Sequence, residues 1–337
     1  MNLINNKFGE EIMYSTKTVE NSGLIPENIA SRFNIVKNSL EDSYNECLEW
    51  MAVHSKSFYF ASRFLPHEQR KSVAALYAFC RLTDDIVDEA PEGTTIDEIN
   101  VELDKLKTTT SQLVAGYTST IPILQAFGDT VRKHNIPIKY IHELIEGVRM
   151  DLSKKEYATD EELDLYMYRV ASTVGLMMTH IFLENPAPHT LARAADLGKA
   201  MQLTNILRDI KEDYNKGRIY LPKVTREIYR VSEKDLTKKI VKENFKALIR
   251  YESERARAFY HIADLGIEEL PPAAAYTVKV ASRVYKEILN EIKRINYQVL
   301  SQRAIVSKFR KIRIALRIRL EFFWKLHRNH LFVFRDV

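Results

Sequence analysis

The amino-acid sequence predicts an all-α fold, and three observations lead to this prediction. Apolar residues recur at helical spacing along most of the 337 residues. No stretch of any length alternates apolar and polar residues in the way that a half-buried strand does. The chain contains only 10 Gly and 10 Pro residues, so few positions interrupt a helix. Because no linker, repeat or low-complexity segment is visible, we expect one large domain.

The expected helices follow from apolar spacing and from residues that start or end helices. The first 27 residues are polar and irregular, and we expect them to be disordered. Pro66 suits the first turn of a helix, and Gly217 suits the end of the central one. Gly266 and the pair Pro271 and Pro272 separate the last two long helices. The expected helices cover residues 28–54, 66–91, 97–117, 121–135, 137–152, 159–183, 198–217, 232–265 and 273–299.

Composition and charge narrow the class of protein only partly. The net charge of +5 is modest and says little about partners. The two cysteines, Cys47 and Cys80, match no metal or redox spacing, so we interpret both as buried core thiols, which fits a reducing cytoplasm. The N-terminus lacks the apolar segment of a signal peptide. The most apolar run, residues 170–183, is too short to span a bilayer, so we expect a soluble or peripheral protein.

Polar residues recur every four positions within the stretch 198–222. Asn205, Asp209 and Asp213 would therefore lie on one face of a helix. The residues between them are apolar, which predicts that this face borders a cavity rather than bulk water. Because two carboxylates at this spacing repel each other, something positive must offset their charge.

A second acidic pair lies much earlier in the chain. Asp84 and Asp88 are also four residues apart in an apolar segment, with Arg81 one turn before them. Two facing helices that each carry such a pair suit Mg²⁺, which takes one or two carboxylates together with water and phosphate oxygens; Mn²⁺ is the alternative ion. From the spacing alone, a metal–diphosphate site and a buried structural ion network stay equal alternatives.

Residues 54–60, HSKSFYF, break the apolar spacing just before an aromatic cluster. One interpretation is an ordinary connection between two helices. The other is a lid, in which Lys56 and the neighbouring hydroxyl groups close over phosphates while the aromatic residues shield the site.

The tail from residue 303 to residue 335 is basic. Arg310, Arg313 and Arg317 share one side of a helix, but Arg319 falls among the apolar residues, so the amphipathicity is imperfect. A solvated charged helix and peripheral attachment to an anionic membrane surface are both open interpretations. Nucleic acid is a poor fit, because the basic residues form no groove-reading motif.

Five ordered blocks of sequence resemble the squalene/phytoene synthases, a family that joins two prenyl diphosphates head to head. The resemblance covers roughly residues 45–315 and implies an isoprenoid-synthase helical bundle around a central cavity. It also implies a catalytic domain at 28–315, preceded by the segment 1–27 and followed by a basic extension at 316–337. The blocks are HSKSFYF (54–60), ALYAFCRLTDDIVDE (75–89), YMYRVASTVGLMM (166–178), QLTNILRDIKEDYNKGRIYLP (202–222) and VYKEILNEIKRINYQVLSQRAIVS (284–307).

The resemblance also implies roles for individual residues. The expected metal ligands, which would hold Mg²⁺ against two substrate diphosphates, are Asp84, Asp88, Asn205, Asp209 and Asp213; the four aspartates and Tyr166 are the expected catalytic residues. The residues expected to contact diphosphate are Ser55, Lys56, Arg81, Arg208, Arg218, Tyr285 and Arg303. The residues expected to line the cavity are Phe58, Tyr77, Gln202 and Tyr220.

The implied reaction begins when one substrate ionises to an allylic cation. The second substrate attacks it, a cyclopropyl diphosphate forms, and rearrangement gives a linear product. GRIYLP and RVASTVGLMM are most similar to phytoene synthases, which join two geranylgeranyl diphosphates in carotenoid biosynthesis. Presqualene, dehydrosqualene or squalene synthases, which use farnesyl diphosphate, are the alternative; a non-catalytic helical protein of membrane surfaces is another. We expect no NADPH, because no separate nicotinamide-binding feature is visible, and the oligomeric state stays open.

Overall fold

The computed structural model of the protein describes residues 18–19, 39–238 and 241–333. In this part of the chain, the prediction of an all-α fold is confirmed. The expected disorder of residues 1–27 and the beginning of the first expected helix lie outside the described residues, apart from 18–19. The helices are α2 (Leu40–His54), α3 (Lys56–Ser62), α4 (His67–Asp88), α5 (Ile96–Val114), α6 (Pro122–Lys133), α7 (Ile138–Ser153), α8 (Asp160–Met167), the π-helix η1 (Tyr168–Ser172), α9 (Thr173–Phe182), α10 (Pro188–Asn215), α11 (Lys223–Ile228), α12 (Glu233–Leu236), α13 (Glu243–Ile267), α14 (Pro272–Arg294) and α15 (Lys308–Val333).

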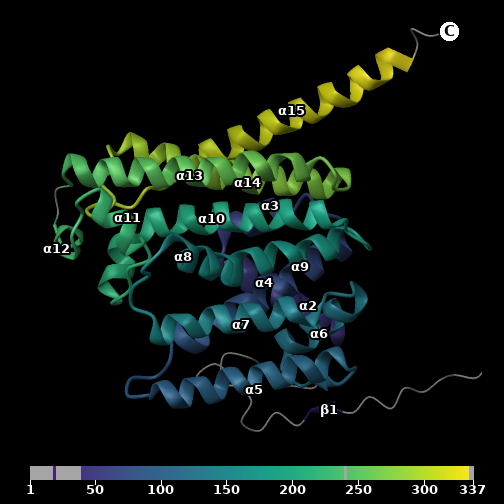
Figure 1. Cartoon of the computed structure of the whole chain (residues 1–337). Helices are drawn as coiled ribbons and strands as arrows, with labels where there is room; N and C mark the ends of the chain where they lie inside the picture. The colour runs from purple at the N-terminus through teal and green to yellow at the C-terminus, as the bar shows by residue number, and fades with distance from the viewer. Residues whose placement is uncertain (1–17, 20–38, 239–240, 334–337) are drawn as a thin grey trace, which may run out of the picture.

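The helices lie in stacked layers, with α13 and α14 at one side of the bundle, α5 at the other and α10 between them (Figure 1). Strand structure among the described residues is limited to one parallel pair of two-residue strands, β1 (Thr18–Val19) and β2 (Thr118–Ser119). One cluster of buried apolar side chains joins α2, α4, α6, α7 and α9, and a second surrounds α10, α13 and α14.

Helix α10 is the central element of the fold, and it contacts α8, η1, α9, α12, α13 and α14. Leu203, Leu207 and Ile210 on this helix are buried, as the apolar spacing predicted. Burying such a side chain contributes about 1.5–3 kcal/mol of transfer free energy. Gly217 adopts a φ of 77° just beyond the helix, which confirms that a glycine ends it.

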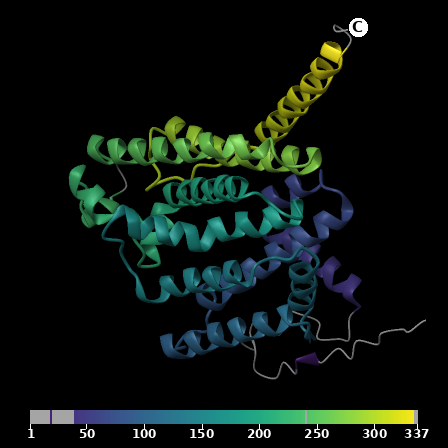
Figure 2. The ribbon, with the colours of Figure 1, turned by 45° about the vertical axis from the view of Figure 1, so that its right-hand side comes forward.

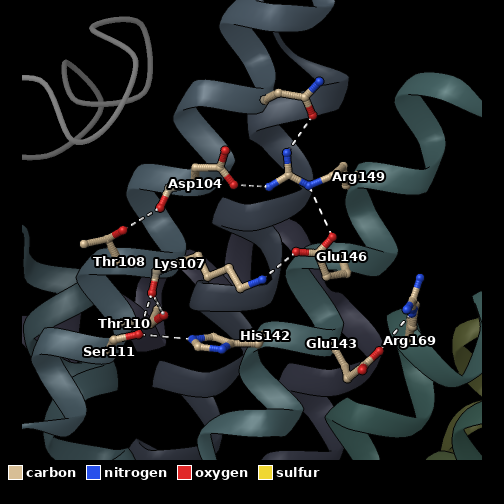
Figure 3. A network of polar contacts seen from close by, with 11 residues as sticks. Asp104, Lys107, Thr108, Thr110, Ser111, His142, Glu143, Glu146, Arg149 and Arg169 are labelled. Carbon is tan, nitrogen blue, oxygen red and sulfur yellow. Dashed lines mark hydrogen bonds and ion pairs between the residues drawn. The ribbon is translucent and has the colours of Figure 1, made fainter.

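The expected helix over 159–183 is interrupted by η1, a π-helix that sequence spacing did not predict. A glycine lets α10 approach η1 closely, because a Cβ added to Gly198 would lie 2.5 Å from the backbone oxygen of Ala171. On the other side of η1, Arg169 donates to Glu143 of α7 at 2.8 Å (Figure 3). The π-helix is therefore held between α7 and α10.

Helices α5 and α7 are joined by a polar network on their facing sides (Figure 3). Arg149 donates to Asp104 at 2.6 Å, and Lys107 donates to Glu146 at 2.7 Å. These pairs are partly exposed, so each contributes little free energy on its own and mainly fixes how the outer helix sits on the bundle.

Three other segments differ from the helices expected from the sequence. Residues 56–62 form the short helix α3, so the expected interruption at Ser55 is a cap between two helices rather than an irregular loop. The segment 232–265 contains two helices, α12 and α13. Gly266 does not separate helices, because it lies inside α13, where an added Cβ would be 2.7 Å from the Cβ of Arg193.

The last helix, α15, leaves the bundle after its first turns and projects away from it (Figures 1 and 2). Ala315 and Ile318 pack against Val280 and Val284 of α14, and the hydroxyl of Tyr276 donates to the backbone oxygen of Ala315 at 3.0 Å. Across the described residues, every helix is too short or too polar to cross a bilayer.

Candidate active site

An apolar cavity of about 300 Å³ lies between α3, α4, α9, α10, α13 and α14. Three aromatic residues that the sequence placed near the site form part of its wall. The ring of Phe58 lies 5.9 Å from that of Tyr77 and 6.0 Å from that of Tyr285. Burial raises the pKa of Tyr77 to about 12, so its hydroxyl stays protonated at neutral pH. Cys80, expected in the core, lines this cavity as well.

A polar pocket of about 330 Å³ adjoins the apolar cavity. The two share Asp84, Val170, Gln202 and Asn205, so the hydrocarbon-lined space opens directly onto charged groups. Most of the predicted site residues meet in the polar pocket, which confirms that the acidic helix faces border a cavity. Its predicted members are Arg81, Asp84, Asp88, Tyr166, Gln202, Asn205, Arg208, Asp209, Asp213, Arg218 and Tyr220.

One carboxylate of each acidic pair has a strongly raised pKa. The side chain of Asp84 is exposed to the polar pocket, but protein surrounds it on its other sides; this desolvation and the charge of Asp88 raise its pKa to about 7. Burial and the charge of Asp209 likewise raise the pKa of Asp213 to about 7. A cation placed between the two helices would therefore stabilise the charged form of both carboxylates.

Asp88, the second carboxylate of the first pair, already forms ion pairs with two cationic side chains. Arg218 Nη1 lies 2.8 Å from Asp88 Oδ1, and Lys216 Nζ lies 3.3 Å from Asp88 Oδ2. Burial alone would raise the pKa of Asp88, but the two cations outweigh burial and lower it. These contacts join α4 to the turn that follows α10.

Asp209 also forms ion pairs with two cationic side chains. Arg208 Nε donates to Asp209 Oδ1 at 2.9 Å, and Arg303 Nη2 lies 2.9 Å from the same oxygen. Arg303 also reaches Glu212 at 3.4 Å. Arg303 and Tyr285 line a separate pocket of about 180 Å³ beside α14, which shares Arg208 with the polar pocket.

Asp151 is a member of the site that the sequence did not reveal. It accepts hydrogen bonds from the hydroxyls of Tyr166, at 3.0 Å, and Tyr220, at 2.9 Å, whose rings stack at 5.0 Å. Burial raises the pKa of Asp151, opposed by Arg218 and by the two hydroxyls. Burial raises the pKa of both tyrosines as well, so they remain donors. Its local sequence, at the end of α7, carries no signal of this role.

The structure does not bring all the predicted diphosphate contacts together. Ser55 and Lys56 line neither the apolar cavity nor the polar pocket. Ser55 caps α3 by accepting from the backbone of Phe58 and hydrogen-bonds to Tyr77. Arg81 lines the polar pocket, but its Nη2 lies 2.6 Å from Asp85 and 3.0 Å from Glu89. Asp85, which is buried, thus positions Arg81, a role that the sequence did not reveal.

The donor set of the polar pocket fits a hard divalent cation that is also bound by phosphate. All the predicted ligands offer oxygen, and the buried Oδ1 of Asn205 has no hydrogen-bond partner among the described residues. In the part of the chain that the structure describes, no three His, Cys, Asp or Glu side chains gather closely enough to hold a metal by themselves. Because Mg²⁺ commonly takes only one or two carboxylates, substrate oxygens would complete its shell.

Comparison with known proteins identifies the family. The family model described as squalene/phytoene synthase matches residues 51–310. A phytoene synthase from Arthrospira platensis is 36% identical over 283 residues, which cover 80% of this chain and 90% of that protein. A 15-cis-phytoene synthase from Synechococcus elongatus is 35% identical over 286 residues, which cover 81% and 91%.

Among solved structures, a dehydrosqualene synthase with a bound ligand superposes with a TM-score of 0.78 at 29% identity, covering 84% of this chain and 97% of that one. A squalene synthase from Alicyclobacillus acidocaldarius gives 0.69 at 26% identity, covering 82% and 98%. The chain belongs to the squalene/phytoene synthase family, and its fold is the helical bundle that these enzymes share. It is a prenyltransferase of that family.

Proposed function

We propose that the protein is a phytoene synthase, which condenses two geranylgeranyl diphosphates head to head, through a cyclopropyl diphosphate, and releases diphosphate. The observation that carries the proposal is the junction at Asp84 and Asn205, where an apolar cavity opens onto a pocket lined by two acidic pairs and by arginines. This division suits a substrate with a long hydrocarbon chain and a diphosphate head. The similarity to curated phytoene synthases supports the choice within the family.

We assign the diphosphate groups to the cationic side of the polar pocket. Arg208 and Arg218 offer planar guanidinium groups that can bind phosphate oxygens in pairs. Asp84, Asp88, Asp209 and Asp213, with Asn205, would hold Mg²⁺, with Mn²⁺ as the alternative ion. When bound, the cation supplies positive charge that stabilises the departing diphosphate. Arg81, which lines the polar pocket, and Arg303, which lines the neighbouring pocket beside α14, would contact the same groups.

The apolar side protects the reacting carbons. A carbocation would be quenched by water, so the dry wall of Phe58, Tyr77 and Val174 matters as much as the charges do. Aromatic ring faces also stabilise a nearby cation. Tyr166 stays protonated and points its hydroxyl at Asp151, so we assign the final proton loss to the released diphosphate.

A farnesyl diphosphate-using enzyme is the second candidate, favoured by the close superposition with a dehydrosqualene synthase. The same site residues would act, and only the depth of cavity filled by the hydrocarbon would differ. For a phytoene or dehydrosqualene synthase we expect no NADPH in the reaction, whereas formation of squalene would require NADPH as the reductant.

We also propose that residues 28–315 form the catalytic domain and that the enzyme works in the cytoplasm as a peripheral membrane protein. Long-chain prenyl substrates and a hydrocarbon product partition into membranes, which supports this location. The proposed division at residue 315 falls inside α15.

The test is to incubate the purified full chain with Mg²⁺ and with farnesyl or geranylgeranyl diphosphate, separately, with and without NADPH, and to identify products by mass spectrometry. We expect a forty-carbon product from geranylgeranyl diphosphate. A thirty-carbon product from farnesyl diphosphate, with no product from geranylgeranyl diphosphate, would favour the second candidate. No product from either substrate, with the protein folded, would refute an enzymatic function and favour a non-catalytic membrane-surface protein.

Variants connect this activity to the site. Asp84→Ala and Asp209→Ala are each expected to lower turnover about 100-fold or more, the usual scale for removing a group that stabilises charge in the transition state. Asp97→Ala, on the exposed first turn of α5, is the matched control and should leave turnover unchanged. Equal turnover in all three variants would remove the acidic pairs from the mechanism.

A further inference from the structure

Helix α15 carries two opposite apolar faces, and only one of them is used inside the protein. Ala315 and Ile318 pack on α14. The other face presents a row of large side chains at helical spacing, which we call the apolar stripe of α15. Their exposed fractions decide the point: Phe309 is 87% exposed, Ile312 48%, Leu316 55% and Leu320 59%. At about 100° per residue, these four side chains fall within one quarter of the helix surface.

Positive charges border this stripe on both sides. Lys308 and Arg319 fall on one edge of it, and Arg313 and Arg317 on the other, and all four are exposed. The acidic residue that follows, Glu321, lies 3.2 Å from Arg317. Arg310 is not part of this border, because it reaches back to Glu287 of α14 at 2.6 Å. The surface is therefore an apolar centre with cationic edges, on a helix that projects from the bundle (Figure 2).

We propose that the apolar stripe of α15 docks on the surface of an anionic lipid bilayer; this inference rests on the proposed function. Large apolar side chains flanked by Lys and Arg are the pattern of a helix that lies in the membrane interface, with its apolar face among the acyl chains and its cations at lipid phosphates. A second copy of this chain fits less well, because a symmetric contact would bring the same cationic edges together. A nucleic acid would leave the apolar centre unused.

The position of the stripe connects the membrane to the site. The pocket beside α14 is lined by Ile305, Lys311 and Arg303, immediately before and within the first turn of α15. Ile305 is itself exposed, so the apolar surface continues to the rim of this pocket. The pocket shares Arg208 with the polar pocket and Tyr285 with the apolar cavity. Docking would thus bring an opening with cationic and apolar walls to the depth where prenyl diphosphates lie in a bilayer.

The experiment measures binding of the full chain to vesicles of phosphatidylcholine with and without phosphatidylglycerol, by flotation. We expect binding that depends on phosphatidylglycerol and weakens as salt is added, because exposed charges are screened. Phe309→Ser combined with Leu316→Ser should weaken binding about tenfold or more. Val53→Ser combined with Ile228→Ser is the matched control: both residues are as exposed as the stripe, but lie on α2 and α11, and binding should not change.

Three outcomes would overturn the proposal. The first is unchanged vesicle binding by the stripe variant, and the second is equal binding to both kinds of vesicle. The third is a wild-type dimer in solution that the stripe variant converts to monomer, which would make the stripe an interface between copies. Turnover of detergent-dispersed geranylgeranyl diphosphate should stay unchanged in the stripe variant, so a failed membrane proposal and a failed enzymatic function give different results.

Discussion

At the scale of single residues, the site depends on groups that hold the predicted residues in place. Asp151 accepts from Tyr166 and Tyr220 and faces Arg218. The acidic pairs could be read from the sequence because their spacing is local. Asp151 could not, because its partners are distant in sequence and meet it only in the folded bundle.

Replacing Asp151 with Asn tests its role. The amide keeps the size of the side chain but removes one of the two acceptors and the negative charge, so one tyrosine hydroxyl loses its acceptor and Arg218 loses a charge partner. We expect kcat to fall about 10–100-fold, the usual cost of losing a group that orients others in a site. Tyr220→Phe is the control, since it removes one of the two hydrogen bonds but leaves the charge of Asp151 in place, and it should have the smaller effect. Unchanged kcat, with the same circular dichroism spectrum as wild type, would make Asp151 a structural residue only.

Glu252 is buried away from this site and gives a prediction about pH. Burial raises its pKa from 4.5 to about 7, opposed by Arg255. The folded state therefore holds a proton that the unfolded chain has released between these two values. The stabilising contribution of this bound proton to the free energy of unfolding is complete below about pH 4.5 and is lost as the pH rises through about 7.

Glu252→Gln should consequently be more stable than wild type at about pH 8, by about 1–2 kcal/mol, and equal to it at about pH 4.5. Arg255 would keep Asp160, at 3.0 Å, and Asp164, at 2.5 Å, as partners. Urea unfolding of both proteins at the two pH values measures this difference. A difference in the free energy of unfolding between the two proteins that is the same at both pH values would mean that Glu252 does not change its protonation in the folded state.

At the scale of elements, helix positions were predictable where the signal is local. The helix expected at 97–117 is found at Ile96–Val114, and a capping box between Thr95 and Glu98 begins it. The π-helix η1 was not predictable, because it depends on contacts with α7 and α10. The short helix α3 was not predictable either, because it begins at Lys56, directly after Ser55, where the apolar spacing is interrupted.

Gly198→Ala tests the close approach of α10 to η1. Alanine normally favours a helix, but here its Cβ would meet the backbone of Ala171, which cannot move aside as a side chain can. We expect the free energy of unfolding to fall by about 1–3 kcal/mol. In Gly128→Ala, the added Cβ meets side-chain atoms at 3.1 Å, so this control should lose less. Thermal unfolding of both variants and of wild type measures this difference in stability. A Gly198→Ala protein as stable as wild type would contradict the close packing of α10 on η1.

At the scale of the whole molecule, the bundle places its hydrocarbon cavity and its charged pocket end to end. Sequence blocks could identify the family and the charged groups, but the cavity depth that selects a substrate is a property of several packed helices. Ala281 of α14 lines this cavity and offers a place to change it.

Ala281→Phe would fill part of the apolar cavity and is expected to disfavour the longer substrate. The kcat/KM for geranylgeranyl diphosphate should fall about tenfold more than that for farnesyl diphosphate, as cavity-filling changes discriminate hydrocarbons on this scale. Ala281→Ser, which adds little volume, serves as the control. Equal losses for both substrates would place the hydrocarbon ends elsewhere in the bundle.

The arginines that already neutralise Asp88 and Asp209 have a consequence for the order in which ligands assemble. A diphosphate that draws Arg208 and Arg218 to itself leaves each carboxylate with one cationic partner in place of two, Lys216 for Asp88 and Arg303 for Asp209, and a divalent cation then replaces the positive charge that was lost. Anion and cation should each bind weakly alone and tightly together, and the gain must be reciprocal. The enzyme at rest would thus be a self-neutralised pocket that exchanges its internal ion pairs for a complete set of external ones.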